Sequence, residues 1–172
     1  MTTRRGADSR RGMAPDIDAI ARRLGALEDR DAIRSLIAAY GPLADSGEAA
    51  ELAGLWAEDG GYGVGGIGTA HGRNAIAGLI DGETHRALMA DGCAHLLGPV
   101  AIDLDGDRAV ARGHSIVFRH HAGAFAVHRV SANRWDLERR GGQWRVRHRE
   151  NALLDGAEQA RALLSPQSAR RP

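Results

Sequence analysis

The spacing of apolar residues in this chain changes near Gly92, from the period of a helix to the period of a strand. Before that point apolar side chains recur every three or four positions; they are Ile33, Leu36, Ile37, Tyr40 and Leu43. This spacing predicts an amphipathic helix from Asp29 to Asp45. After Gly92 apolar and polar residues alternate along segments that are separated by glycine-containing turns. Helices followed by strands predict an α+β fold, with N-terminal helices packed on an antiparallel sheet.

Capping and turn residues predict the remaining elements. Further helices are expected at residues 15–24, 48–56, 73–89 and 156–164. Strands are expected at residues 93–104, 107–119, 124–139 and 142–153, after a short bent strand or hairpin at 62–69. Asp105-Gly106 and Gly141-Gly142 are turn sequences that join two of the strand pairs.

The length of 172 residues fits one domain with its own core. We expect a disordered basic tail at residues 1–14, a single domain at 15–164 and a flexible tail at 165–172. No apolar segment has the length of a membrane span and no secretory signal is recognised, so a cytoplasmic location is expected.

Composition excludes several function classes. The net charge of +1 gives no electrostatic reason to expect binding to nucleic acid or a membrane. All 23 basic residues are arginines, which excludes Schiff-base chemistry and a lysine base. A single cysteine excludes an intramolecular disulfide, and the 8 histidines lack the HExxH spacing of a zinc site. We expect neither a metal nor another cofactor.

The positions of Asp45 and His95 in the sequence predict a general base. Asp45 ends its helix, where the helix dipole disfavours a carboxylate, so a compensating partner is expected. His95 lies between apolar neighbours at the start of the strands, which predicts a buried imidazole. An aspartate that orients an imidazole in an enclosed pocket is the core of a general base. The alternatives are a solvated turn aspartate and a histidine with a purely structural hydrogen bond.

Polar residues also interrupt the apolar strand faces. His114 alternates with apolar Ile116 and Phe118, and Asn133 alternates with Trp135. A buried polar group without a partner costs about 1–3 kcal/mol, so each is expected to bind a structural partner or a substrate. The residues expected to contact substrate are His114, Asn133, Trp56, Cys93 and Phe118.

The alternation of the last strand leaves the direction of Arg149 open. Trp144, Val146 and His148 fall on one face and the arginines on the other. Arg149 faces the pocket only if a bulge shifts the register, or if the arginine face is the inner face near the end of the strand.

Five segments together carry a family resemblance. They are LEDRDAIRSLIAAYGPLAD (27–45), LAGLWAEDGGY (52–62), GIGTAHGRNAI (66–76), AHLLGPVAIDLDGDRAVARG (94–113) and ERRGGQWRVRHREN (138–151). Through them, residues 25–155 resemble the SnoaL-like branch of the nuclear-transport-factor-2-like cone fold. The resemblance is to the group that contains scytalone dehydratase, hexachlorocyclohexane dehydrochlorinase and bile-acid 7α-dehydratase. It implies a cone-shaped α+β barrel that encloses a pocket.

The resemblance also implies catalytic roles. Asp45 and His95 match the aspartate and histidine that these enzymes pair. Tyr40 matches a tyrosine of the bile-acid enzyme and a lysine of the dehydrochlorinase, and Arg149 matches an arginine of the last strand. His114 and Asn133 look like the second histidine and the asparagine of scytalone dehydratase.

The activity expected from this resemblance is cofactor-independent elimination of the dehydratase type, on a small apolar cyclic, polyketide-like or steroid-like molecule. Tyrosine in place of lysine at position 40 favours loss of water over dehydrochlorination. Isomerisation or cyclisation in the same pocket, and a non-catalytic ligand-binding protein, are the alternatives. A homo-oligomer, dimer or trimer, is also expected, with strand 124–139 contributing to its surface.

Overall fold

The computed structural model describes residues 16–65 and 68–166; the expected tail at 1–14 lies outside them, as do residues 167–172. The helices are α1 (Ile17–Ser46), α2 (Ala49–Ala53), α3 (Gly72–Asp81), α4 (Glu83–Asp91) and α5 (Glu158–Leu164). The strands are β1 (Trp56–Val64), β2 (Gly68–His71), β3 (Cys93–Leu97), β4 (Ala101–Asp105), β5 (Arg108–His121), β6 (Ala124–Arg140) and β7 (Gln143–Leu153).

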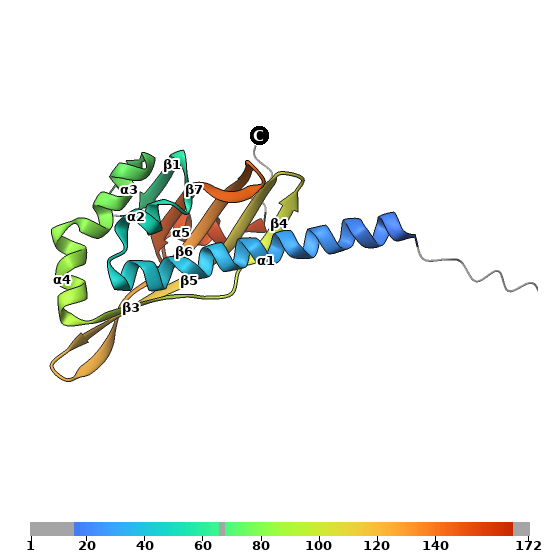
Figure 1. The fold of residues 1–172 in the computed structure, drawn as a ribbon. Coiled ribbons are helices and arrows are strands. Elements are labelled where there is room, and N and C mark those ends of the chain that lie inside the picture. The colour runs from blue at the N-terminus through green and yellow to red at the C-terminus, as the bar shows by residue number, and fades with distance from the viewer. Residues whose placement is uncertain (1–15, 66–67, 167–172) are drawn as a thin grey trace, which may run out of the picture.

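The strands form one curled, unclosed sheet in the order β2-β1-β7-β6-β5-β3, and β4 also pairs with β5. Helices α1 to α4 lie together against it (Figure 1). The predicted α+β cone fold is therefore confirmed. The sheet is mixed and not wholly antiparallel, since β1 and β7 run parallel. Residues 65–142 separate these two strands in the sequence, so no hairpin turn imposes an antiparallel pairing on them.

Helix α1 is continuous, whereas the sequence predicted two helices. Asp16 caps its start by accepting a hydrogen bond of 3.1 Å from the Ala19 N–H. Gly47 ends it with a left-handed φ of 76°. Gly25 does not interrupt the helix, because one interior glycine costs only about 1 kcal/mol relative to alanine.

Three other predicted elements have different bounds. Residues 73–89 form α3 and α4, because Gly82 adopts an extended conformation with ψ of 154°. The helix predicted at 48–56 is short, and Trp56 begins β1. The strand predicted at 93–104 is divided into β3 and β4 around Gly98-Pro99. Proline there cannot donate a hydrogen bond to the sheet.

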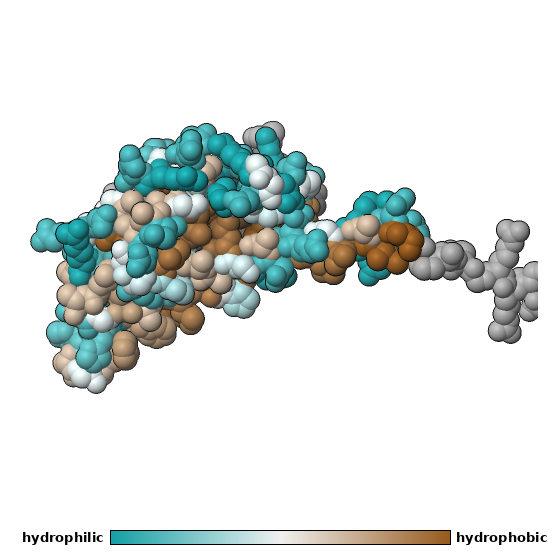
Figure 2. All heavy atoms as spheres, viewed as in Figure 1, coloured by the Kyte–Doolittle hydropathy of each residue, from teal (hydrophilic) through white to brown (hydrophobic). Residues whose placement is uncertain are grey.

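The core lies between the helices and the inner face of the sheet. Its large buried residues include Ile33, Ile37, Tyr40, Leu52, Trp56, Trp135 and Val146. Figure 1 shows the N-terminal part of α1 extending past the sheet, and Figure 2 shows hydrophobic surface on that end. The apolar residues exposed there are Ile17, Ile20, Leu24 and Leu27.

The outer face of the sheet is only partly covered. Helix α5 packs against Ala132 and Ala152. Away from α5, Leu96 in β3 and Val127 near the start of β6 are 56% and 58% exposed. An apolar surface of this kind is typical of a protein–protein interface, and the oligomer stays a prediction. Within the described residues, no helix has both the length and the apolar character to cross a membrane.

Helix α1 and strand β3 lie in close contact at Gly41. A Cβ atom at this position would overlap the carbonyl oxygen of His95. Glycine therefore lets the helix approach the strand, and the end of α1 comes to lie beside the start of β3.

We predict opposite effects for two glycine-to-alanine changes in α1. Gly41→Ala should lower the free energy of unfolding by about 1–3 kcal/mol, because the new methyl group overpacks the contact with β3. Gly25→Ala, where a Cβ meets nothing within 4 Å, should raise it by about 0.5–1 kcal/mol. Urea denaturation measures both. Equal effects of the two changes would contradict the close approach.

Candidate active site

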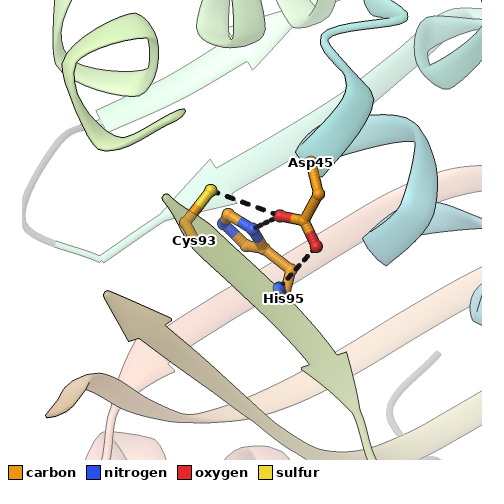
Figure 3. Close-up of side chains that lie close together, drawn as sticks. All are labelled: Asp45, Cys93 and His95. Carbon is orange, nitrogen blue, oxygen red and sulfur yellow. Dashed lines mark hydrogen bonds and ion pairs between the residues drawn. The ribbon is translucent and has the colours of Figure 1, made fainter. Parts of the chain in front are cut away.

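The carboxylate of Asp45 and the imidazole of His95 are in direct contact (Figure 3). Asp45 lies in the last turn of α1, and His95 lies in β3. Asp45 Oδ1 is 2.6 Å from His95 Nδ1, and Asp45 Oδ2 accepts a hydrogen bond of 2.8 Å from the His95 backbone N–H. Cys93 Sγ donates a longer bond of 3.4 Å to Asp45 Oδ1. Three donors thus offset the unfavourable position of this carboxylate at a helix C-terminus.

This contact determines which imidazole nitrogen can act as a base. A carboxylate only accepts hydrogen bonds, so Nδ1 carries the hydrogen and the neutral ring has its lone pair on Nε2. Burial lowers the pKa of His95 below its ordinary value, and the opposing attraction of Asp45 does not reverse this. The His95 side chain is 13% exposed and forms part of a cavity wall. A neutral imidazole with an available Nε2 therefore faces the cavity.

Asp45, Cys93 and His95 present possible metal ligands within 4.8 Å of one another. Burial, together with the Asp45 carboxylate, raises the pKa of the Cys93 thiol to about 11. A metal ion would have to displace this proton and the Nδ1 hydrogen of His95. The three groups fit a hydrogen-bonded cluster better than a metal centre.

The cavity beside His95 has a volume of about 490 Å³, a size typical of small-molecule sites. Its wall is mainly apolar; the apolar residues include Val64, Leu79, Ile80, Ala87, Leu88, Leu97 and Val117. Tyr40 and Arg149 belong to the same wall as His95, whereas Asp45 lies behind His95. The structure thus brings the four predicted catalytic residues to one place.

Arg149 faces the cavity because β7 contains a bulge. The pairing of β6 with β7 shifts between Asp136 and Leu137, which leaves Arg147 unpaired and turns Arg149 to the side of Val146. The guanidinium carbon lies 4.1 Å from the centre of the Tyr40 ring. Asn133 Oδ1 accepts hydrogen bonds of 3.1 and 2.7 Å from Nε and Nη2 of Arg149. Nη1, although buried, has no partner among the described residues.

Tyr40 connects the arginine to the histidine. Its ring centre lies 6.3 Å from that of His95, and its hydroxyl is 3.3 Å from the hydroxyl of Tyr62. Burial raises the pKa of Tyr62 far above its ordinary value, so this phenol stays protonated. The two hydroxyls form a hydrogen-bonded pair beside Arg149.

The structure keeps His114 and Phe118 away from the cavity, so their expected inward direction is wrong. His114 is exposed. Ser115 and Val117, which alternate with these residues on β5, line the cavity instead. From Ala109 to Val117 the inner face of β5 is built from small and medium-sized residues, and its larger apolar side chains, Ile116 and Phe118, lie on the outer face.

The other three residues expected to contact substrate lie behind the cavity wall. Trp56 is fully buried in the core, where its Nε1 donates to the Gly61 carbonyl oxygen. Cys93 contacts Asp45, and Asn133 contacts Arg149. Cys93 and Asn133 therefore touch the site through other residues.

Sequence analysis missed several polar residues of the cavity wall, among them His85, His128 and Arg129. His85 Nε2 donates a hydrogen bond of 2.8 Å to the Ala44 carbonyl oxygen near the end of α1, and its ring centre lies 5.4 Å from that of His95. Arg129 alternates with Ser131 and Asn133 on the inner face of β6, and the bulge in this strand lies next to it, at His128. Helical spacing could have placed His85 on the inner side of its helix, and alternation with Asn133 could have placed Arg129 on the inner face of β6. Alternation alone does not reveal the bulge at His128.

Comparisons with known proteins agree with the fold. The SnoaL-like domain family matches residues 25–150. An NTF2-like protein with a cystatin-like fold from Novosphingobium aromaticivorans is 62% identical, with a TM-score of 0.86 over 90% of this chain and 99% of that one. No curated protein matches the sequence.

Two more distant structures share the fold. A candidate scytalone dehydratase from Novosphingobium aromaticivorans is 20% identical, with a TM-score of 0.63 over 74% of this chain and 85% of that one. ActVI-ORFA from Streptomyces coelicolor is 21% identical, with a TM-score of 0.65 over 74% of this chain and 98% of that one.

The lowered pKa of His95 predicts a pH dependence of stability. Between this pKa and the unfolded value of about 6.5, the unfolded chain binds a proton that the folded protein does not. The contribution of His95 to the free energy of unfolding is therefore complete above about pH 6.5, and it is lost as the pH falls through the folded-state pKa of His95. His95→Gln should remove this part of the acid-side decline.

Thermal unfolding of both proteins from about pH 5 to 8, followed by circular dichroism, measures this contribution. Parallel pH profiles for wild type and His95→Gln would contradict the lowered pKa. So would a wild-type contribution that is lost as the pH rises.

Proposed function

The chain belongs to the SnoaL-like domain family, which includes dehydratases and cyclases, and on this premise we propose that it is a cofactor-independent lyase of the dehydratase type. The proposal rests on one observation, the 2.6 Å contact between Asp45 and His95 at the wall of an apolar cavity. Its substrate would be a small, largely apolar cyclic molecule, polyketide-like or steroid-like, with an acidic C–H bond and a hydroxyl leaving group.

In this proposal His95 Nε2 removes the proton from carbon. The Nδ1 hydrogen is already held by Asp45, so the ring cannot rotate and the imidazolium that forms is stabilised by the carboxylate. The depressed pKa of His95 keeps the ring unprotonated near neutral pH. A positioned base of this kind contributes about 10²–10⁴ in rate.

Arg149 and Tyr40 stabilise the negative charge that develops on oxygen. The unpartnered Nη1 of Arg149 is a donor without an acceptor, which an enolate or carbonyl oxygen would supply. Buried donors held in place by Asn133 need little reorganisation during the reaction. The Tyr40 hydroxyl adds a further donor.

Elimination then needs no further acid. The electron pair of the C–H bond forms the new double bond, the C–O bond breaks, and the imidazolium of His95 returns its proton to the departing hydroxide as water. If the imidazolium instead returns the proton to another carbon, the product is an isomer. The same groups therefore support isomerisation or cyclisation as the second candidate, and the structural relationship to a candidate scytalone dehydratase favours elimination.

Product mass distinguishes these activities. We predict that the wild-type protein converts a member of a panel of cyclic hydroxy-ketones and hydroxy-acids to a product lighter by one water. An unchanged mass would support isomerisation or cyclisation. Binding without turnover across the panel would support a non-catalytic ligand-binding protein and contradict the lyase.

His95→Gln and Asp45→Asn should each lower kcat/KM by about 10²–10⁴, because one removes the base and the other its orienting group. His114→Gln is the matched control, since His114 is exposed and lies outside the cavity wall; it should keep the wild-type rate. Circular dichroism establishes that each variant is folded. A folded His95→Gln protein with near wild-type kcat/KM would exclude the general-base role.

A further inference from the structure

Two arginines of the cavity wall have no carboxylate partner. Arg129 and Arg149 both line the cavity, and neither forms an ion pair with a described residue. Arg119 lines the same cavity but is paired with Asp91, to which its Nε donates a hydrogen bond of 2.6 Å. Glu83 is the one acidic residue among the described residues of the wall, and it pairs with neither arginine. The cavity therefore carries uncompensated positive charge.

Neutral amides hold these two guanidinium groups in place. Arg129 Nη2 donates to Asn151 Oδ1 at 3.1 Å, and Asn151 Nδ2 donates to Asn133 Oδ1 at 3.0 Å. Asn133 Oδ1 also accepts from Arg149. Because guanidinium groups only donate, both amides must turn their oxygens toward the arginines. The network orients the charges but does not neutralise them.

A charge in a mainly apolar wall is costly unless it is paired. The aromatic rings around Arg149 reduce this cost, since its guanidinium carbon lies 4.1 to 4.6 Å from the ring centres of Tyr40, Trp135 and Tyr62. Arg129 has no such ring contact among the described residues and is bound only by neutral oxygens. An anionic ligand would complete its pairing.

The pairing of strands places Arg129 two strands away from His95, the proposed base. His95 pairs with Val117, and Val117 pairs with Arg129, so the three residues form a row across β3, β5 and β6. Adjacent strands lie about 4.8 Å apart, which puts the backbones of His95 and Arg129 about 10 Å apart. All three side chains line the cavity. A molecule held at Arg129 and deprotonated by His95 would lie over Val117.

We propose that the substrate is a cyclic organic carboxylate, with its ionised carboxyl group bound by Arg129 and its ring over Val117. Arg149 remains available for the charge that develops during the reaction. The inference rests on the proposed function in that this cavity is the substrate site. It adds a permanent negative charge to the expected substrate.

Matched pairs of acids and amides test this charge. Cyclohexanecarboxylate, benzoate and 2-naphthoate are each compared with the corresponding carboxamide by isothermal titration calorimetry at about pH 7.5, where the acids are ionised. The wild-type protein should bind at least one acid about ten- to a hundred-fold more tightly than its amide. Amides that bind as well as acids at every ring size, or no binding of any acid, would overturn the proposal.

Substitutions assign the preference to one arginine. Arg129→Gln should bring the acid within about three-fold of its amide. Arg119→Gln is the matched control and should keep the preference, since that charge is already paired with Asp91. A preference that survives in Arg129→Gln would overturn the assignment. If that variant does not fold, Arg129→Lys is compared instead: it should weaken the preference, and an unchanged preference would count against the proposal.

His95→Gln separates this inference from the proposed function. It should abolish turnover and leave the preference for acids intact. A wild-type protein that prefers acids but turns none over would refute the lyase and keep the carboxylate site. Turnover of neutral hydroxy-ketones without a preference for acids would refute the carboxylate site and keep the lyase.

Discussion

The hydrogen-bonded contact between the Asp45 carboxylate and His95 joins the fold to the site. A carboxylate in the last turn of a helix is unfavourable, and here β3 supplies the side-chain and backbone N–H groups of His95 that compensate it. The contact requires α1 and β3 to lie close together, which Gly41 permits. The same interaction therefore positions β3 against the helix and fixes the imidazole nitrogen that faces the cavity.

The mainly apolar cavity keeps this imidazole in the form that can accept a proton. Burial disfavours the imidazolium, so the ring stays neutral until it takes a proton from a bound molecule. Arg129 in β6 and Arg149 in β7 carry positive charge at the cavity wall, which favours negative charge in the ligand or in the transition state. A fixed base and cations in the cavity wall suit proton removal from carbon, the step that elimination and isomerisation share.

Much of this arrangement could be predicted from sequence, because it depends on periodicity and on position at the ends of elements. The change of period at Gly92 predicts the α+β fold, and the places of Asp45 and His95 predict a polar pair. Alternation correctly places His114 and Phe118 on the same face of β5, but it does not determine whether that face points toward the cavity. From Ala109 to Val117 that inner face carries small and medium-sized side chains, against the usual expectation that large apolar residues lie inside. The bulge that directs Arg149 inward depends on pairing between strands, which one sequence does not record.

The tautomer of His95 tests the central claim most directly. Nitrogen-15 NMR of the imidazole side chains distinguishes a nitrogen that carries hydrogen from one with a free lone pair. Above the pKa of His95, we expect hydrogen on Nδ1 and a lone pair on Nε2, with the signals perturbed in Asp45→Asn. Hydrogen on Nε2 in the neutral ring, or spectra that do not respond to the loss of the Asp45 carboxylate, would contradict it.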